Sequence, residues 1–298
     1  MWADYAEELP FFERWWKQIR HGAWWLQQFL SNGKKPPAVY VFPEMPSRRA
    51  ALTKITRELG WELTNRPRHS ALLGIRFEDI THKPLMSLPA EMQSGILWWN
   101  AHCKDISKKA VENQHVSAFG YGMAIDPLTH NGPMVCKSDA NAMHDGQVLE
   151  GPIESEEVSG TAVYQRVIDN RDEQDRYFDY RAVYIQGEIV LVYRKFKHPL
   201  HRFTNETVSV DLLNTLPFSE IECTAIASMA SGLGIDYAEL DALRDRSSGR
   251  LFVVDVNPTP WGPPAQLATE FQNEAVKRMA QAFSASVQLS CKNDLKAP

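Results

Sequence analysis

Hydrophobic and polar positions alternate with two different periods along the chain, and the changes of period mark its elements. Apolar residues recur at three- and four-residue spacing over residues 10–30, which predicts an amphipathic, tryptophan-rich helix. Shorter apolar runs bounded by glycine, proline and other turn residues predict β-strands. We expect these strands over residues 38–42, 61–64, 71–77, 122–125, 133–137, 162–168, 178–186, 188–196, 235–243 and 250–256.

Cap residues predict where further helices begin. Serines stand at three of these points, Ser47, Ser107 and Ser219, and a serine hydroxyl can accept a hydrogen bond from the first helical turn. Ser219 is followed three residues later by Glu222, which forms a capping box. We expect these helices, and one at the C-terminal end, over residues 47–59, 107–119, 219–231 and 264–286.

The order of these elements divides the chain into three units of an α/β (α+β) protein. Strand, helix and strand follow one another within residues 1–99, which predicts an N-terminal α/β domain behind the tryptophan-rich helix. Residues 100–160 are predicted to form a small lid subdomain, and the polar run 138–160 within it is expected to be a mobile loop. Residues 161–290 are richest in strands and are predicted to form a larger subdomain with an antiparallel sheet.

Composition narrows the class of protein. The chain has 298 residues, of which 44% are hydrophobic and 23% charged, as in an ordinary globular protein. A net charge of -5 argues against a general nucleic-acid-binding surface. No apolar run approaches the roughly 18 residues that a membrane-spanning helix needs, so no membrane partner is expected. Four scattered cysteines indicate reduced thiols, and we expect a cytoplasmic protein.

The strand that ends at Asp255-Val-Asn257 carries two oxygen ligands. Side chains at i and i+2 of a strand share a face, roughly 6.5 Å apart, so Asp255 and Asn257 can aim at one point. Carboxylate and amide oxygens suit magnesium, which usually also binds substrate phosphates. Taken alone, this pattern is also typical of a strand end with an Asx turn. Asp241 on the preceding strand adds a further carboxylate.

Cations on other predicted strands complete the pattern. Lys137 ends a strand of the lid, and Arg181, Arg194 and Lys195 lie on two paired strands. Arg194 and Lys195 must point to opposite faces, and we expect Lys195 in the cleft. Positive charge for phosphate oxygens and negative charge for Mg2+ are what a metal-bound triphosphate requires. The chain has no P-loop and no protein-kinase signature.

This set of residues, over roughly residues 100–275, resembles the ATP-grasp superfamily of carboxylate–amine ligases. The segment Phe252-Val-Val-Asp255-Val-Asn257-Pro is similar to the family's strand that ends in acidic-x-Asn before a proline. The resemblance implies that Asp255 and Asn257 are magnesium ligands, together with Asp241 one strand earlier. It implies ATP and Mg2+ as cofactors.

The same resemblance suggests roles for residues of the cleft. Asp179-Tyr-Arg181 is similar to the family's Asp-x-Arg strand, whose arginine faces the transferred phosphate or the substrate. Met134-Val-Cys-Lys137 resembles the strand whose lysine contacts the α- and β-phosphates. Residues expected where the hinge strand holds the adenine are Gln165, Arg166 and Val167, and those expected to act in catalysis are Arg181, Lys195 and Asn205.

Two departures from the family pattern leave the substrate open. The glycine pair that usually follows the asparagine near the γ-phosphate is absent after Asn205. The lid loop carries His144 and Asp145, which are either general acid–base groups or solvated loop residues.

The resemblance implies an ADP-forming ligase that activates a carboxylate as an acyl-phosphate and transfers it to an amine or a similar nucleophile. Its partners would be small-molecule or peptide acid and amine substrates. The sequence leaves the oligomeric state open, with a homo-oligomer as one alternative. A phosphotransferase on the same scaffold remains open, as does a non-catalytic nucleotide- or partner-binding protein that uses the tryptophan-rich helix as its interface.

Overall fold

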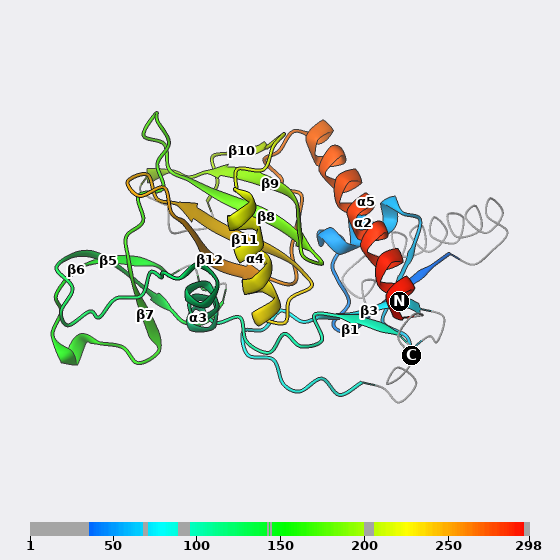
Figure 1. Cartoon of the computed structure of the whole chain (residues 1–298), viewed down its shortest axis with the longest axis horizontal. Coiled ribbons are helices and arrows are strands. Elements are labelled where there is room, and N and C mark those ends of the chain that lie inside the picture. The colour runs from blue at the N-terminus through cyan, green and yellow to red at the C-terminus, as the bar shows by residue number, and fades with distance from the viewer. Residues whose placement is uncertain are drawn as a thin grey trace, which may run out of the picture.

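Three sheets lie side by side in the computed structural model (Figure 1). The predicted tryptophan-rich helix over residues 10–30 lies outside the described part of the chain. None of the described helices is both long and apolar enough to cross a membrane. The structure describes residues 36–67, 71–88, 96–141, 143, 145–199 and 206–294.

The N-terminal unit is a parallel sheet with the strand order β2-β1-β3-β4. Its two long strands are nearly continuous apolar runs and are buried almost throughout, as expected for a parallel sheet covered on both faces. The strand–helix–strand order predicted from the sequence is confirmed. The elements are β1 (Ala38–Pro43), α2 (Ala51–Glu58), β2 (Glu62–Thr64), β3 (Ala71–Phe77) and β4 (Leu97–Trp99).

The prediction that Ser47 caps α2 is wrong. The helix begins at Ala51, and its N-cap residue Ala50 makes no side-chain cap hydrogen bond. The Ser47 hydroxyl accepts instead from the Arg49 N–H at 3.2 Å, which forms a local turn ahead of the helix. The Ala51 N–H donates to the carbonyl of Pro260 at 2.9 Å. A contact with a distant loop therefore satisfies a donor at the start of this helix.

The central unit is an antiparallel sheet with the strand order β10-β9-β8-β11-β12. Gln186 and Gly187 join β8 to β9 with positive φ values of 46° and 91°, as in a tight hairpin turn. The short edge strand β10 was not predicted. The strands are β8 (Phe178–Ile185), β9 (Glu188–Phe196), β10 (Ser209–Leu212), β11 (Tyr237–Arg244) and β12 (Leu251–Asn257).

Helices cover both faces of this sheet (Figure 1). One face packs against α3 (Lys108–Phe119) and α4 (Glu220–Gly232), and the other against α5 (Thr269–Asp294). The predicted caps of α3 and α4 are confirmed. The Ser107 side chain accepts from a backbone N–H of the first turn of α3, and Ser219 forms a reciprocal capping box at the start of α4.

The third sheet is small, antiparallel and ordered β6-β5-β7. The prediction that residues 138–160 form a loop is wrong in part, because this stretch contains β6 and a 3-10 turn. The strand expected over residues 122–125 is reduced to a single bridge between Ala124 and Gln165. The strands are β5 (Gly132–Ser138), β6 (Gln147–Gly151) and β7 (Ala162–Arg166).

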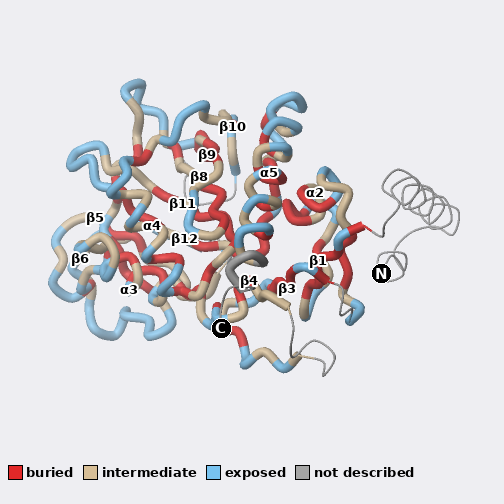
Figure 2. The backbone as a smooth tube through the Cα atoms, turned by 45° about the vertical axis from the view of Figure 1, so that its right-hand side comes forward, coloured by how far each residue is buried: buried red, intermediate tan, exposed pale blue. Residues whose placement is uncertain are grey.

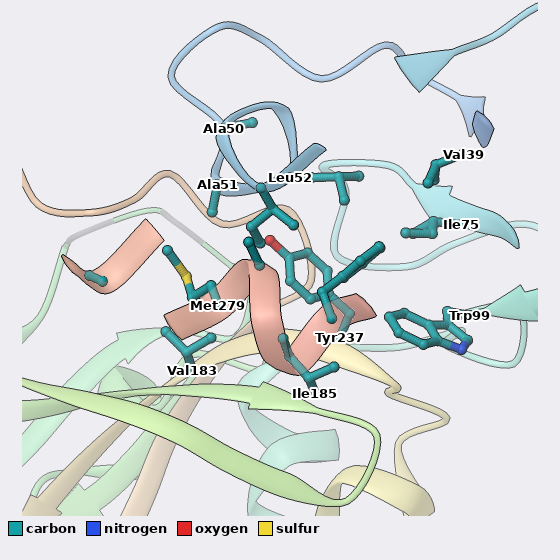
Figure 3. Packing of buried hydrophobic residues seen from close by; sticks show 14 of the residues in the cluster. Val39, Ala50, Ala51, Leu52, Ile75, Trp99, Val183, Ile185, Tyr237 and Met279 are labelled. Carbon is teal, nitrogen blue, oxygen red and sulfur yellow. The ribbon is translucent and has the colours of Figure 1, made fainter. Parts of the chain in front are cut away.

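The largest hydrophobic core joins the N-terminal unit to the central sheet. Buried stretches follow the strands of these two units, whereas the outer edge near β5 and β6 is more exposed (Figure 2). Tyr237 and Ile185 of the central sheet lie near Leu52 and Trp99 of the N-terminal unit, with Met279 of α5 beside them (Figure 3). This shared core holds the two sheets in a fixed relation.

Phe283 is expected to be one of the most sensitive positions of this core. Its fully buried ring makes edge contacts with Trp61, Trp99 and Tyr237, from three different strands or loops. Phe283→Ala is expected to lower the free energy of unfolding by about 3–5 kcal/mol in chemical denaturation. Phe271→Ala, on a ring that is 44% exposed in the same helix, is the matched control. A loss at Phe283 no larger than that at Phe271 would contradict this account of the core.

Candidate active site

A pocket of about 540 Å3 lies between the small sheet and the central sheet. Eight of the ten site residues predicted from the sequence line it. Val167, just after β7, is not among its lining residues, and Asn205 and His144 lie outside the described residues. The eight that line the pocket are Lys137, Gln165, Arg166, Arg181, Lys195, Asp241, Asp255 and Asn257.

Part of the pocket lining is apolar. Met123, Val135, Ile168, Leu243 and Val254 line it and come from both sheets and the segments beside them. Val135, Leu243 and Val254 come from three different strands, β5, β11 and β12. An apolar slot flanked by polar side chains suits a flat heteroaromatic ring.

Strand β7 contributes Gln165 and Arg166 to the pocket lining. The backbone N–H of Arg166 donates to the carbonyl of Met123 at 2.9 Å. Gln165 is buried, and its side chain belongs to the pocket wall. Any contact of the Arg166 backbone with a ligand would therefore fall to its carbonyl rather than to its N–H.

Arg181 and Asp241 form a two-point ion pair on the pocket floor. The Arg181 Nε lies 2.7 Å from Asp241 Oδ1, and its Nη2 lies 2.8 Å from Oδ2. Burial works against both charges, but Asp241 raises the pKa of Arg181, and Arg181 with Lys195 holds the pKa of Asp241 well below its ordinary value. Both groups are therefore charged at neutral pH.

Two lysines of β9 and the segment after it extend this floor. Lys195 is buried, lines the pocket and has its Nζ 3.8 Å from Asp241 Oδ2. Arg194 points away and binds Asp211 at 2.8 Å on the edge strand β10, as strand alternation requires. Lys197 lies 3.8 Å from Asp179 Oδ2, and burial raises the pKa of this carboxyl.

Lys108, which the sequence analysis did not select, binds a predicted metal ligand. Its Nζ lies 2.7 Å from Asp255 Oδ1 and 3.4 Å from Asn141 Oδ1 of the lid. The polar density around Ser107 suggests a contact site, but a capped helix start explains most of it without function. A lysine in the first turn opposes the helix macrodipole, and this unfavourable placement was the available signal.

Glu239 was also missed. It lies two residues before Asp241 on β11, is 2% exposed, and has one oxygen 3.6 Å from Arg181 Nη1. Neither carboxylate oxygen has a hydrogen-bond partner among the described residues. Burial raises the pKa of Glu239 to about 7 despite the opposing charge of Arg181. A buried carboxylate at this position has no signature in the sequence that separates it from an ordinary strand residue.

Lys137 of β5 faces the pocket from the lid. Burial lowers its pKa to about 8, and the nearby Lys108 acts in the same direction. Asp145 lies close by in the pocket wall and accepts a hydrogen bond from the Ser138 N–H at 3.1 Å. The small sheet thus brings a cation with a lowered pKa to the same pocket as the carboxylates of the central sheet.

The oxygen donors of Asp241, Asp255 and Asn257 fit a magnesium ion that also binds phosphate. Asp241 and Asp255 are register partners on adjacent strands. Asn257 Oδ1 accepts from the N–H and hydroxyl of Thr259 at 2.9 and 3.1 Å, in an Asx turn. No group of three or more His, Cys, Asp or Glu forms a self-sufficient metal site in the described ranges. Two carboxylates and an amide suit magnesium, which usually takes its other ligands from phosphate and water.

Comparison with protein-family models and with curated proteins gives no match, whereas solved structures match over most of the chain. An ATP-grasp ligase, PsnB, solved with a precursor variant, Mg and ADP, matches with a TM-score of 0.53 and 12% identity. The match covers 85% of this chain and 99% of PsnB. The chain has the ATP-grasp fold.

Two further structures share this ATP-grasp arrangement. The VanG D-Ala:D-Ser ligase of Enterococcus faecalis matches with a TM-score of 0.54 and 11% identity, over 85% of this chain and all of that one. The D-alanine–D-alanine ligase of Bacillus anthracis, solved with ATP, matches with a TM-score of 0.50 and 11% identity. That match covers 87% of this chain and 98% of the ligase. The fold expected from the sequence resemblance is confirmed.

Proposed function

We propose that this protein is an ATP- and Mg2+-dependent, ADP-forming ligase that joins a carboxylate to an amine or a similar nucleophile. The observation that carries the proposal is the pairing of cations and carboxylates in one pocket, with Arg181 on Asp241 and Lys108 on Asp255. The apolar part of the pocket lining suits the adenine ring. The ATP-grasp fold supports the proposal, since the solved structures that share it are ligases by name.

In this proposal different residues of the pocket lining hold different parts of the nucleotide. Gln165 and Arg166 would border the adenine, and Lys137 with Lys108 would face the phosphates. Asp241, Asp255 and Asn257 would hold Mg2+, which would supply positive charge against the phosphates. Arg181 and Lys195 would stabilise the transferred phosphoryl group, as we propose for Asn205.

The proposed reaction proceeds in two displacements. A substrate carboxylate oxygen attacks the γ-phosphorus of ATP. The bond between this phosphorus and the oxygen that bridges the β- and γ-phosphates breaks, and ADP leaves. The amine then attacks the carbonyl carbon of the acyl-phosphate, phosphate leaves, and the amine loses a proton. The cations on the pocket floor stabilise negative charge that grows on the transferred group, and the lid sheet excludes water.

The acceptor side of the pocket would lie toward the N-terminal unit. Asp79 follows β3 and lines the pocket beside Thr259 and Trp261 of the loop after β12. Thr259 Oγ1 donates to Asp79 Oδ1 at 3.2 Å, which ties the two units together here. We propose small-molecule or peptide acids and amines as substrates and the cytoplasm as the location.

The proposal is tested by ADP release over a panel of acid and amine pairs, with mass spectrometry of the product. An amide product together with ADP supports the ligase. A stable phosphorylated product without an amide would assign a phosphotransferase instead. If Mg-ATP causes no thermal shift and no pair releases ADP, the protein is not this enzyme.

The pKa of Lys137 predicts a pH dependence of nucleotide affinity. The free side chain is cationic below its pKa of about 8 and neutral above it. Bound phosphate favours the cation and raises this pKa, so affinity should be constant well below pH 8 and weaken above it, by up to about tenfold per pH unit. Isothermal titration with a non-hydrolysable ATP analogue measures this profile. Lys137→Met should bind more weakly at low pH and lose the decline, and a variant that keeps it would assign the titration elsewhere.

A further inference from the structure

Each of the two proposed carboxylate ligands already binds a side-chain cation. Arg181 holds both oxygens of Asp241, at 2.7 and 2.8 Å. Lys108 holds one oxygen of Asp255 at 2.7 Å. A metal ion at these carboxylates therefore competes with Arg181 and Lys108. A cation that is displaced from its carboxylate needs another hydrogen-bond acceptor.

The competition is strictest at Asp241. Magnesium binds oxygen at about 2.0–2.1 Å and demands a near-octahedral arrangement. The planar guanidinium of Arg181 uses Nε and Nη2 on the two Asp241 oxygens and leaves Nη1 pointing elsewhere. Each Asp241 oxygen keeps a lone pair beyond its hydrogen bond to Arg181, but a metal ion bound there would lie close to the guanidinium and repel it. This repulsion favours a shift of Arg181 away from at least one of the two oxygens.

A second carboxylate, that of Glu239, lies beside Arg181. Glu239 Oε2 lies 3.6 Å from Arg181 Nη1, just beyond hydrogen-bond distance. Glu239 and Asp241 are two residues apart on β11 and so share a face of the sheet. The side chain of Glu239 is 2% exposed, and neither of its oxygens has a hydrogen-bond partner within the described ranges. A buried carboxylate left in this way is costly and calls for a reason.

The loop after β12 lies over Glu239, and the N-terminal unit holds that loop in place. A Cβ placed on Gly262 would approach Glu239 Oε1 to 2.7 Å, so the loop after β12 lies directly on the carboxylate. Lys54 of α2 donates to the Gly262 carbonyl at 2.8 Å and fixes that loop. Glu239 itself is not among the lining residues of the pocket, whereas Arg181, 3.6 Å away, is.

We propose that Glu239 is the second acceptor of Arg181, so that the guanidinium passes from Asp241 toward Glu239 when a metal–nucleotide complex takes Asp241. Glu239 is a positioning residue in this scheme, because it acts through Arg181 and touches no reacting atom. The exchange keeps Arg181 charged and at the pocket floor while it frees Asp241. This inference rests on the proposed metal site at Asp241 and Asp255.

Lys108 has a comparable alternative. Its Nζ lies 3.4 Å from Asn141 Oδ1 of the lid, in addition to its contact with Asp255. Each cation on a proposed ligand therefore has another acceptor within one short movement. Asn141 offers a neutral amide oxygen, whereas Glu239 offers a buried carboxyl group, so the stronger coupling is expected at Arg181.

The test measures metal affinity rather than turnover. Electron paramagnetic resonance of Mn2+ titrated in the presence of a non-hydrolysable ATP analogue counts free and bound metal. Glu239→Gln is expected to weaken Mn2+ binding by about tenfold, because an amide holds a guanidinium less well and leaves Arg181 on Asp241. Tyr237→Phe is the matched control. It removes a buried hydroxyl that has no hydrogen-bond partner in the described part of the chain, two residues earlier on the same face, and should leave the affinity unchanged.

The outcomes separate this inference from the proposed function. If wild type binds no Mn2+–nucleotide complex, both the proposed function and this inference are overturned. If wild type binds and Glu239→Gln binds equally well, the inference alone is overturned. Should Glu239→Gln fold poorly, Glu239→Asp keeps the charge but shortens its reach, and it should also weaken binding. A crystal structure with Mg2+ and the analogue that keeps both Arg181–Asp241 contacts would likewise overturn it.

Discussion

Asp255→Ala is expected to reduce ADP release at least about 100-fold, by analogy with the loss of one group that stabilises transition-state charge. The mutation removes one of two carboxylates proposed to hold Mg2+ and leaves Lys108 without its partner at 2.7 Å. Lys108 would then place positive charge where the metal should lie. Both effects weaken the metal–nucleotide complex, so the loss should appear in the affinity for Mg-ATP as well as in turnover.

Asp211→Ala is the matched control for this experiment. Asp211 is also an ion-paired carboxylate of the central sheet. It lies on the edge strand β10, binds Arg194 of β9 and does not line the pocket. ADP release should stay near the wild-type rate in this variant. Equal turnover in wild type and Asp255→Ala would remove the basis of the proposed mechanism, and equal losses in both variants would point to the stability of the sheet instead.

Much of the site follows from strand periodicity alone. Asp255 and Asn257 both line the pocket because alternate residues of β12 share a face. The same alternation separates Lys195, which lines the pocket, from Arg194, which pairs with Asp211 outside it. The position of a polar residue in a strand therefore predicts, from the sequence alone, to which face of the sheet its side chain points.

The residues that were missed owe their place to tertiary contacts. Lys108 and Asp255 are 147 positions apart, and only the packing of α3 against the central sheet brings them together. Glu239 differs from ordinary polar strand residues because the loop around Gly262 buries it, and no local sequence pattern predicts this burial. Ser47 failed as a cap because the backbone of Pro260 satisfies the start of α2. The contacts between units could not be predicted because they join segments with no local relation.

The Arg181–Asp241 pair should contribute strongly to stability as well as to chemistry. Both side chains are about four-fifths buried, with 22% and 20% of their surfaces exposed. Arg181→Met leaves the Asp241 charge with only Lys195 at 3.8 Å, and Asp241→Asn leaves Arg181 facing Glu239 at 3.6 Å. Each single change is expected to cost about 2–4 kcal/mol in chemical denaturation, slightly below the about 3–5 kcal/mol of a fully buried broken pair.

The double variant distinguishes a paired charge from simple packing. Arg181→Met combined with Asp241→Asn removes both charges, so it should cost no more than either single change, and the two losses should be far from additive. The exposed pair Arg194–Asp211 supplies the matched cycle, with 34% and 47% of its side chains exposed and an expected coupling of at most about 1 kcal/mol. Additive losses at Arg181 and Asp241 would mean that each acts through its own neighbours, and the floor of the pocket would then hold no coupled pair for a metal ion to displace.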